Sequence, residues 1–149
     1  MRETEAELAG EMSGHFFFAE RWFGFDDGIY AAARLLEILD GSGMAPEELF
    51  ATLPDGISTP EIKVEAPDGD PHAFVDRFKL VAKFEGARLS TLDGLRVDWP
   101  DGWGLVRASN TTPILVMRFD ADTNAGMARI QQAFREQLHL VQPDLTLPF

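Results

Sequence analysis

Apolar residues follow a helical spacing in roughly the first third of the chain and a mixed pattern after it. Between positions 29 and 39 they recur at intervals of three and four, which predicts an amphipathic helix. Asp26 and Asp27 precede it as alternative N-caps. A second, short helix is expected over 45–53 and a short strand within 5–9. These elements are too few for a core of their own, so we expect the tail end of an α/β domain whose other strands lie upstream.

The rest of the chain alternates strand and helix patterns. Strands are expected at 61–65, 95–99, 103–108 and 114–119, and helices at 72–84 and 124–141. The second and third strands flank the turn Pro100-Asp101-Gly102, so they should form a hairpin. The predicted fold class is α+β: a two-layer sandwich of a four-stranded, mainly antiparallel sheet with two helices, preceded by the partial α/β domain.

A linker separates the two parts. Residues 54–60 contain two prolines and one glycine and have no apolar periodicity. The charge balance also changes here: residues 1–55 carry 3 basic and 12 acidic groups, whereas residues 56–149 carry 10 and 13. We therefore expect one domain part over 1–54, a hinge linker over 55–60 and a second domain over 61–149.

The amino-acid composition argues against several classes of function. The net charge of −12 opposes nonspecific binding to nucleic acid and to anionic membranes, but not to a small anion held by a local cluster. The chain has no cysteine, which excludes disulfides and thiolate zinc sites. The start is acidic and polar, unlike a targeting peptide, and the long apolar runs are broken. A cytoplasmic protein without membrane contact is the expectation.

Two polar clusters could carry chemistry. Arg107, Ser109, Asn110 and Thr111 end the strand 103–108 and offer a guanidinium fork, hydroxyls, an amide and backbone N–H groups. Converging donors of this kind suit a phosphate dianion, although an ordinary strand end with a surface arginine is the alternative.

The second cluster lies between Gly10 and Gly14. There Glu11 could accept hydrogen bonds from two sugar hydroxyls, Ser13 could donate and accept, and His15 could transfer a proton. A structural turn is the alternative. No hydrolytic triad, metal-ligand spacing or glycine-rich nucleotide loop is recognisable.

Together the two clusters resemble a known family, the α-D-phosphohexomutases. Gly10-Glu11-Met12-Ser13-Gly14-His15, continued by residues 20–28, is similar to their sugar-binding loop. Arg107-Ala108-Ser109-Asn110-Thr111-Thr112-Pro113, preceded by Asp101-Gly102-Trp103, is similar to the phosphate-binding loop of their C-terminal domain. Residues 58–61 and 147–149 also fit. Within the family, the long matching runs resemble the bacterial phosphomannomutase/phosphoglucomutase group.

The resemblance implies binding roles for this chain rather than chemistry. In such four-domain enzymes the phosphoserine and the aspartate loop that holds Mg²⁺ belong to upstream domains, and neither motif occurs here. We therefore expect no catalytic residue, with His15 as a candidate acid/base or orienting group, and no metal ligand. The sugar would be bound by Glu11, Met12, Ser13, Gly14 and His15. The phosphate would be bound by Arg107, Ala108, Ser109, Asn110 and Thr111.

The implied reaction interconverts hexose 1-phosphates and 6-phosphates of glucose and mannose through a bisphosphate intermediate. The expected partners are glucose 1-phosphate, glucose 6-phosphate, mannose 1-phosphate, mannose 6-phosphate and the upstream domains of the same protein. The 149-residue chain alone should be inactive. Two alternatives are a stand-alone, non-catalytic phosphosugar-binding module and a protein-interaction domain in which the Arg107 cluster is incidental.

Overall fold

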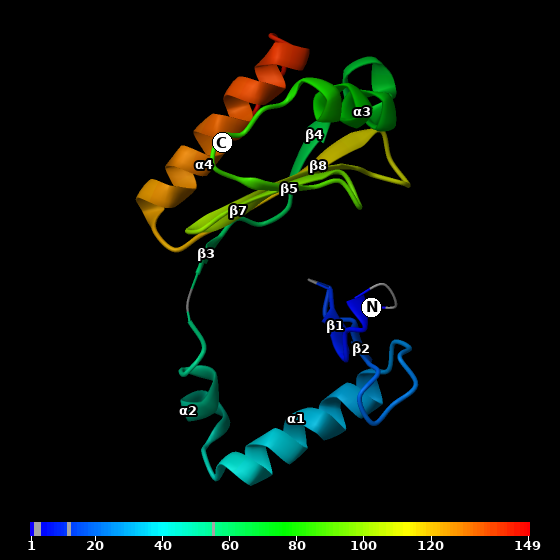
Figure 1. Ribbon diagram of the computed structural model, residues 1–149, viewed down its shortest axis with the longest axis vertical. Helices are drawn as coiled ribbons and strands as arrows, with labels where there is room; N and C mark the ends of the chain where they lie inside the picture. Colours follow the sequence, from blue (N-terminus) through cyan, green and yellow to red (C-terminus); the bar gives the residue numbers. More distant parts are fainter. Residues whose placement is uncertain (2–3, 12, 55) are drawn as a thin grey trace. The chain divides into compact units, whose positions relative to one another are not determined.

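The computed structural model describes residues 1, 4–11, 13–54 and 56–149 (Figure 1). The chain forms two compact units, Met1–Pro54 and Asp55–Phe149. Each unit is described separately below.

The first unit contains a small antiparallel hairpin and two helices. Strands β1 (Leu8–Gly10) and β2 (Phe16–Phe18) pair so that Gly10 lies opposite Phe16. The helices are α1 (Gly28–Ser42) and α2 (Pro46–Phe50). Both helices were expected, and Asp27 is the N-cap of α1, since its carboxylate accepts a 2.9 Å hydrogen bond from the Tyr30 N–H.

The predicted apolar face of α1 is largely uncovered. No side chain of this helix is buried, and Ile29 and Leu36 are 87% and 65% exposed. An amphipathic helix of a globular domain normally buries that face. The prediction that these residues are only part of a domain accounts for the exposure.

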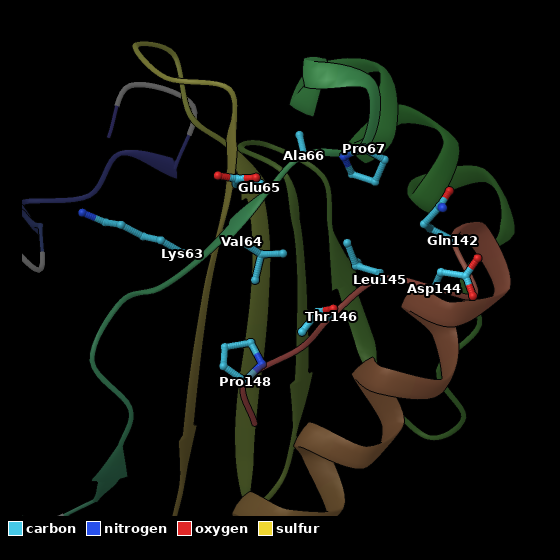
Figure 2. Close-up of a pocket in the computed structure, with 10 residues that line it drawn as sticks. All are labelled: Lys63, Val64, Glu65, Ala66, Pro67, Gln142, Asp144, Leu145, Thr146 and Pro148. Atoms are coloured by element: carbon cyan, nitrogen blue, oxygen red, sulfur yellow. The ribbon is translucent and has the colours of Figure 1, made fainter.

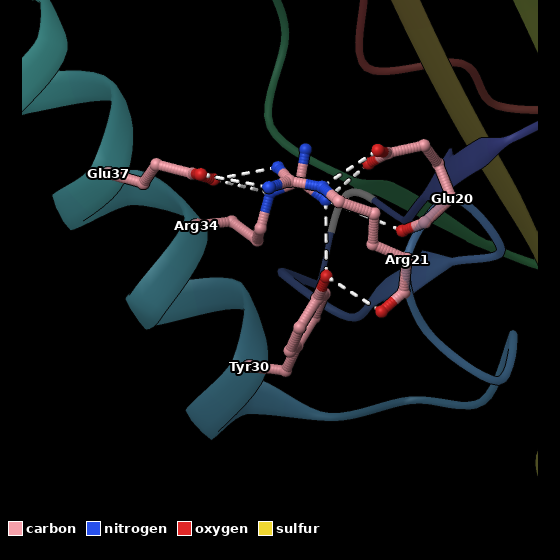
Figure 3. A network of polar contacts seen from close by, with 5 residues as sticks. All are labelled: Glu20, Arg21, Tyr30, Arg34 and Glu37. Carbon is pink, nitrogen blue, oxygen red and sulfur yellow. Dashed lines mark hydrogen bonds and ion pairs between the residues drawn. The ribbon is translucent and has the colours of Figure 1, made fainter.

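A polar network attaches the loop after β2 to α1 (Figure 3). Arg21 donates two hydrogen bonds to Glu37, at 2.9 and 2.7 Å. Arg34 donates at 2.6 Å to Glu20 and at 3.2 Å to the Tyr30 hydroxyl. Hydrogen bonding to Arg21 lowers the pKa of the Glu37 carboxyl from its ordinary value, and the nearby Arg34 charge adds to this effect.

The second unit is a six-stranded antiparallel sheet with helices α3 (Pro71–Val81) and α4 (Asn124–Val141) on one face (Figure 1). A short 3₁₀ turn, η2 (Pro67–Gly69), precedes α3. The strands are β3 (Ile57–Ser58), β4 (Ile62–Glu65), β5 (Arg88–Ser90), β6 (Leu95–Trp99), β7 (Gly102–Ala108) and β8 (Ile114–Ala121). Their order is β3-β8-β7-β6-β5. Strand β4 pairs with the same edge of β8 as β3 does, but nearer the start of β8.

The α+β sandwich was predicted correctly, but the prediction of four strands was wrong. The missed strands are β3 and β5, which contain two and three residues. Runs this short cannot show an alternating pattern, so only pairing with a neighbour reveals them. Ile57 and Ser58, expected within the linker, pair with Ala121 and Asp120 of β8.

The core lies between the sheet and the two helices. Phe74 and Phe78 from α3, Phe134 from α4 and Phe119 from β8 are completely buried. Alternate residues of β6, β7 and β8 face this core, which leaves the intervening residues on the opposite face. We call that side the open face, because neither α3 nor α4 covers it. Val81, expected in the buried stripe of α3, is 44% exposed at the end of the helix.

Candidate functional site

The first predicted cluster is the loop that joins β1 to β2. The Glu11 N–H donates to the His15 carbonyl at 2.9 Å, and the Gly14 N–H donates to the Glu11 carbonyl at 3.0 Å. Gly14 has a φ of +87°, a backbone conformation that a residue with a Cβ rarely adopts. These backbone hydrogen bonds hold the loop, and the side chains of Glu11, Ser13 and His15 are exposed.

The structure brings together two of the predicted sugar-binding side chains. Ser13 Oγ donates a 3.1 Å hydrogen bond to the Glu11 carboxylate. That carboxylate keeps further acceptor positions for hydroxyl groups of a ligand. Met12, also predicted to bind the sugar, lies outside the described residues.

His15 belongs to the same loop, but its partner comes from outside it. His15 Nδ1 lies 2.6 Å from Asp26 Oδ2. A carboxylate at Nδ1 favours the tautomer that carries its proton there, so Nε2 is left as the second functional nitrogen of the ring. Such a pair can orient an imidazole for hydrogen bonding or proton transfer.

The sequence analysis missed the contact of Asp26 with the predicted site residue His15. Asp26 was read as one of two alternative helix caps, whereas the structure uses only Asp27 as the cap. The sequence did contain one indication of this role, namely the two adjacent aspartates. One helix has one N-cap, so the second of two adjacent aspartates is free for another role.

The second predicted cluster is the loop from β7 to β8. The Ser109 N–H donates to the Ile114 carbonyl at 3.0 Å and closes the loop. Ser109 Oγ lies 2.8 Å from Thr112 Oγ1, and it accepts longer hydrogen bonds from the N–H groups of Thr111 and Thr112, at 3.4 and 3.3 Å. Thr112, which was not among the predicted binding residues, therefore belongs to the same hydroxyl cluster.

Arg107 is the next-to-last residue of β7 and lies on the open face. Its only ion pair with a described residue is a 3.9 Å contact from Nη1 to the exposed carboxylate of Asp93. This pair is too long for a hydrogen bond and would be worth little in solvent. The guanidinium fork is therefore available to an anion.

Ala108 and Asn110, the remaining predicted phosphate-binding residues, differ in the exposure of their side chains. The Ala108 side chain is buried in the core, so this residue could contact a ligand only through its backbone. Asn110 is exposed, and its side chain makes no hydrogen bond to the part of the chain described here.

Gly94, in the loop between β5 and β6, sets the backbone position of Arg107. A Cβ at Gly94 would lie 2.6 Å from Arg107 Cβ and 2.7 Å from Arg107 Cα, and it would overlap the Val106 carbonyl. With a φ of +79°, this residue also has a backbone conformation that favours glycine. The sequence analysis missed Gly94, because only the folded sheet shows what lies against it.

Two further observations concern all of the described residues. Among the described residues, no group of three His, Asp or Glu side chains could hold a metal ion. None of the helices in this part of the chain combines the length and apolar character needed to cross a membrane.

The second unit also contains a cavity of about 550 Å³ that includes neither loop (Figure 2). It is lined by residues of β4 and η2 and by the C-terminal segment. Val64 and Leu145 face it, whereas Lys63 extends away from the other lining residues.

Two sequence models of known domains match this chain. Residues 1–56 match "phosphoglucomutase/phosphomannomutase, alpha/beta/alpha domain III", and residues 61–137 match the C-terminal domain of the same proteins. The chain belongs to the phosphoglucomutase/phosphomannomutase family. The resemblance seen in the two loop motifs is therefore confirmed.

Individual relatives of this family cover all or nearly all of the chain. It is 56% identical over 149 residues to the phosphomannomutase/phosphoglucomutase of Pseudomonas syringae pv. tomato and 54% identical to that of Pseudomonas aeruginosa PAO1. A phosphoglucomutase of Neisseria gonorrhoeae is 55% identical over 96% of the chain. In each case the match spans about 32% of the relative's length.

A solved structure agrees with this assignment. The crystal structure of a phosphoglucomutase/phosphomannomutase family protein from Burkholderia thailandensis has a TM-score of 0.84 and 51% identity. The match covers 99% of the present chain and 31% of the other. The chain thus corresponds to about a third of the length of its relatives, and the match to domain III and the C-terminal domain identifies which part.

Proposed function

We propose that this chain is the C-terminal, ligand-binding part of a phosphohexomutase that interconverts the 1-phosphates and 6-phosphates of glucose and mannose. The proposal is carried by one observation: in a chain of this family, Arg107 lies next to the Ser109 hydroxyl cluster and forms no strong ion pair with any described residue. In this role the β7–β8 loop binds the phosphate that is not being transferred. The family membership and the names of the relatives support the proposal.

The chemistry of the loop suits an intermediate that must bind in two orientations. Arg107 supplies charge and two parallel donors, and Ser109, Thr111 and Thr112 supply hydroxyls that rotate. A phosphate has nearly equivalent oxygens, so such a loop recognises it whichever end of a hexose bisphosphate it belongs to. After the first transfer the intermediate would turn around and present its other phosphate to the same loop.

The β1–β2 loop would recognise the sugar. Glu11 and Ser13 would bind the 3- and 4-hydroxyls, and Asp26 would hold His15 in one orientation as a candidate acid/base. Glucose and mannose differ only at C2, so contacts to O3 and O4 admit both. This gives a physical reason for a site that accepts two hexoses.

The reacting groups would lie in other domains of the protein. An upstream serine would carry the transferred phosphoryl group, and upstream carboxylates would hold the Mg²⁺ that stabilises charge during transfer. The contribution of this chain would be to bind and orient the substrate. The hinge expected within residues 55–60 would be confined to the part before β3, because Ile57 and Ser58 pair with β8. Cytoplasmic location stays a prediction.

A binding titration tests the phosphate site. Glucose 1-phosphate is added to the isotopically labelled 149-residue chain, and amide shifts are followed by NMR. We expect saturable shifts in residues 107–112, and Arg107→Ala should weaken binding by about 1.5–3 kcal/mol, the typical worth of a hydrogen bond to a charged group. Arg88→Ala is the matched control, because Arg88 is exposed on edge strand β5. Equal affinity of the Arg107→Ala variant and the wild type contradicts the proposal.

An activity assay separates the enzyme from a non-catalytic binding module. The full-length protein should interconvert glucose 1-phosphate and glucose 6-phosphate, whereas the 149-residue chain should bind the sugar phosphates without turnover. An inactive full-length protein that still binds would favour the module. Turnover by the chain alone would place the chemistry in this chain and would contradict the proposed division of roles.

A further inference from the structure

A second arginine occupies the open face next to Arg107. In the antiparallel register, Arg107 lies opposite Val116, and Leu105 lies opposite Arg118. Directly opposed residues share a face of the sheet, so Arg118 is on the same face as Arg107 and is its diagonal neighbour across β7 and β8. Long side chains can interact across this diagonal.

The guanidinium of Arg118 differs from that of Arg96 on the same face, because no described residue forms a hydrogen bond or ion pair with it. Its Nε is buried and makes no hydrogen bond, and the structure shows no ion pair from Arg118 to any described residue. By contrast, Arg96 donates two hydrogen bonds to Asp98, at 3.0 and 2.8 Å, and stacks over Trp103. A buried, unsatisfied donor on a charged group is costly, so a bound acceptor is expected there.

The nearest carboxylate on the same strand and face does not pair with Arg118. Asp120 lies two residues after Arg118 on β8, and it accepts a hydrogen bond from the Ser58 hydroxyl. It makes no ion pair with Arg118 within the described residues.

Val116 lies beside three cationic side chains of the open face, which Glu65 of β4 shares. Val116 is on the open face, yet it is only 7% exposed. Arg107 of β7 and Lys63 of β4 lie on either side of it in the sheet, and Arg118 follows on the same strand. Among the described residues, Lys63 forms a single ion pair, a 3.8 Å contact to Glu61. Three cations thus surround one apolar side chain, in a chain of net charge −12.

We infer that Arg118 is a second phosphate-contacting residue of the Arg107 site and contributes to its preference for a dianion. The inference rests on the proposed function of that site. A phosphate dianion has enough oxygens to accept from two guanidinium groups and from the hydroxyl loop together. Two adjacent arginines without a carboxylate between them repel each other until such an anion binds.

The test uses the labelled 149-residue chain, with inorganic phosphate and glucose 1-phosphate as probes at constant ionic strength. Arg118→Gln should weaken the binding of both probes about tenfold, the effect of losing one charge-assisted hydrogen bond. Arg118→Lys, which keeps the charge but loses the fork, should have an intermediate affinity. Arg96→Gln is the matched control: it removes one positive charge from the same face and should change the affinity less than twofold.

A direct readout avoids dependence on the variants. In the wild-type chain, the Nε–Hε NMR signal of Arg118 should shift during the phosphate titration and saturate at the same concentration as the amide of Ser109. Sodium chloride at matched ionic strength should not reproduce the shift. Circular dichroism and urea unfolding check that each variant is folded before its affinity is compared.

The outcomes separate this inference from the proposed function. If Arg107→Ala weakens binding but Arg118→Gln behaves like Arg96→Gln and the Arg118 signal is static, the inference is overturned and the phosphate site remains. If Arg107→Ala also has no effect, the proposed function fails with it. If Arg107→Ala and Arg118→Gln both lose phosphate affinity and the Arg118 Nε–Hε signal shifts, the inference and the proposed function are both supported.

Discussion

Gly94 packs directly against the backbone of Arg107. A methyl group on Gly94 would lie 2.6 Å from Arg107 Cβ and 2.7 Å from its Cα, well inside van der Waals contact. The loop between β5 and β6 therefore supports the strand position from which the Arg107 guanidinium extends. Any side chain at Gly94 must move either this loop or the end of β7.

We predict that Gly94→Ala destabilises the second unit and also weakens phosphate binding. The left-handed backbone costs roughly 1–2 kcal/mol for a residue with a Cβ, and the overlap adds about 1–3 kcal/mol. Urea unfolding gives the stability change and a phosphate titration gives the affinity. Gly86→Ala is the matched control, since Gly86 has a φ of +67° but open space around its Cβ position. If both variants lose the same stability and neither loses affinity, Gly94 does not position Arg107.

Asp26 should fix the tautomer of His15. The 2.6 Å contact between Asp26 Oδ2 and His15 Nδ1 favours the proton on Nδ1. In ¹⁵N NMR of the wild-type chain above the histidine titration range, Nδ1 should have the shift of a protonated ring nitrogen. Asp26→Ala should move the population toward the Nε2–H form. Asp27→Asn is the control, because asparagine also caps helices and α1 should persist. An unchanged tautomer in Asp26→Ala would show that the contact does not orient the ring.

The first unit should lose stability in acid through Glu37. Its carboxyl has a lowered pKa in the folded chain, chiefly through hydrogen bonds from Arg21. The folded state thus favours the ionised form more than the unfolded state does. The stabilisation is complete above the unfolded pKa and is lost as the pH falls through the lower, folded pKa.

The measurement is an acid titration of the chain monitored by the indole N–H signal of Trp22, whose ring stacks on Tyr30 at 4.2 Å. The wild-type signal should weaken at low pH. Glu37→Gln should be less stable at neutral pH and should lose much of this acid sensitivity. Asp40→Asn, a carboxylate of the same helix without a salt bridge to the described residues, should retain the wild-type profile.

Thr59 should contribute to the attachment of β3 to the sheet. Its hydroxyl accepts a 3.1 Å hydrogen bond from the Phe119 N–H, and its own N–H donates to the Phe119 carbonyl at 2.9 Å. Thr59→Val keeps the shape but leaves the Phe119 N–H without this acceptor, which should cost about 1–3 kcal/mol in urea unfolding. Thr91→Val, at an exposed threonine of the β5–β6 loop, should be neutral. Equal midpoints for the two variants would assign no stabilising role to the Thr59 hydroxyl.

Local spacing was sufficient to predict much of the fold. The three- and four-residue intervals of α1, α3 and α4 and the β6–β7 hairpin were all recognisable. Two strands of the second unit, β3 and β5, were missed because runs of two and three residues cannot show an alternating pattern. Strand β2 of the first unit was missed as well, because its three consecutive phenylalanines do not alternate with polar residues. The residues of the candidate site also fall into those that the sequence revealed and those that only the fold revealed. The loop residues from Glu11 to His15 and from Arg107 to Thr111 were identified from chemistry and family resemblance, and their roles in binding stay predictions.

By itself, the sequence determined the family, the order of helices and main strands, and the two loops that offer donors and acceptors to a phosphosugar. These depend on residue type and on spacing within a few positions. Only the tertiary structure decided that Asp26 pairs with His15, that Gly94 supports Arg107, and that Arg118 lies beside Arg107 with no partner among the described residues. Each of these relationships joins residues 11 or more positions apart, and cross-strand register and loop packing bring them together only in the folded chain.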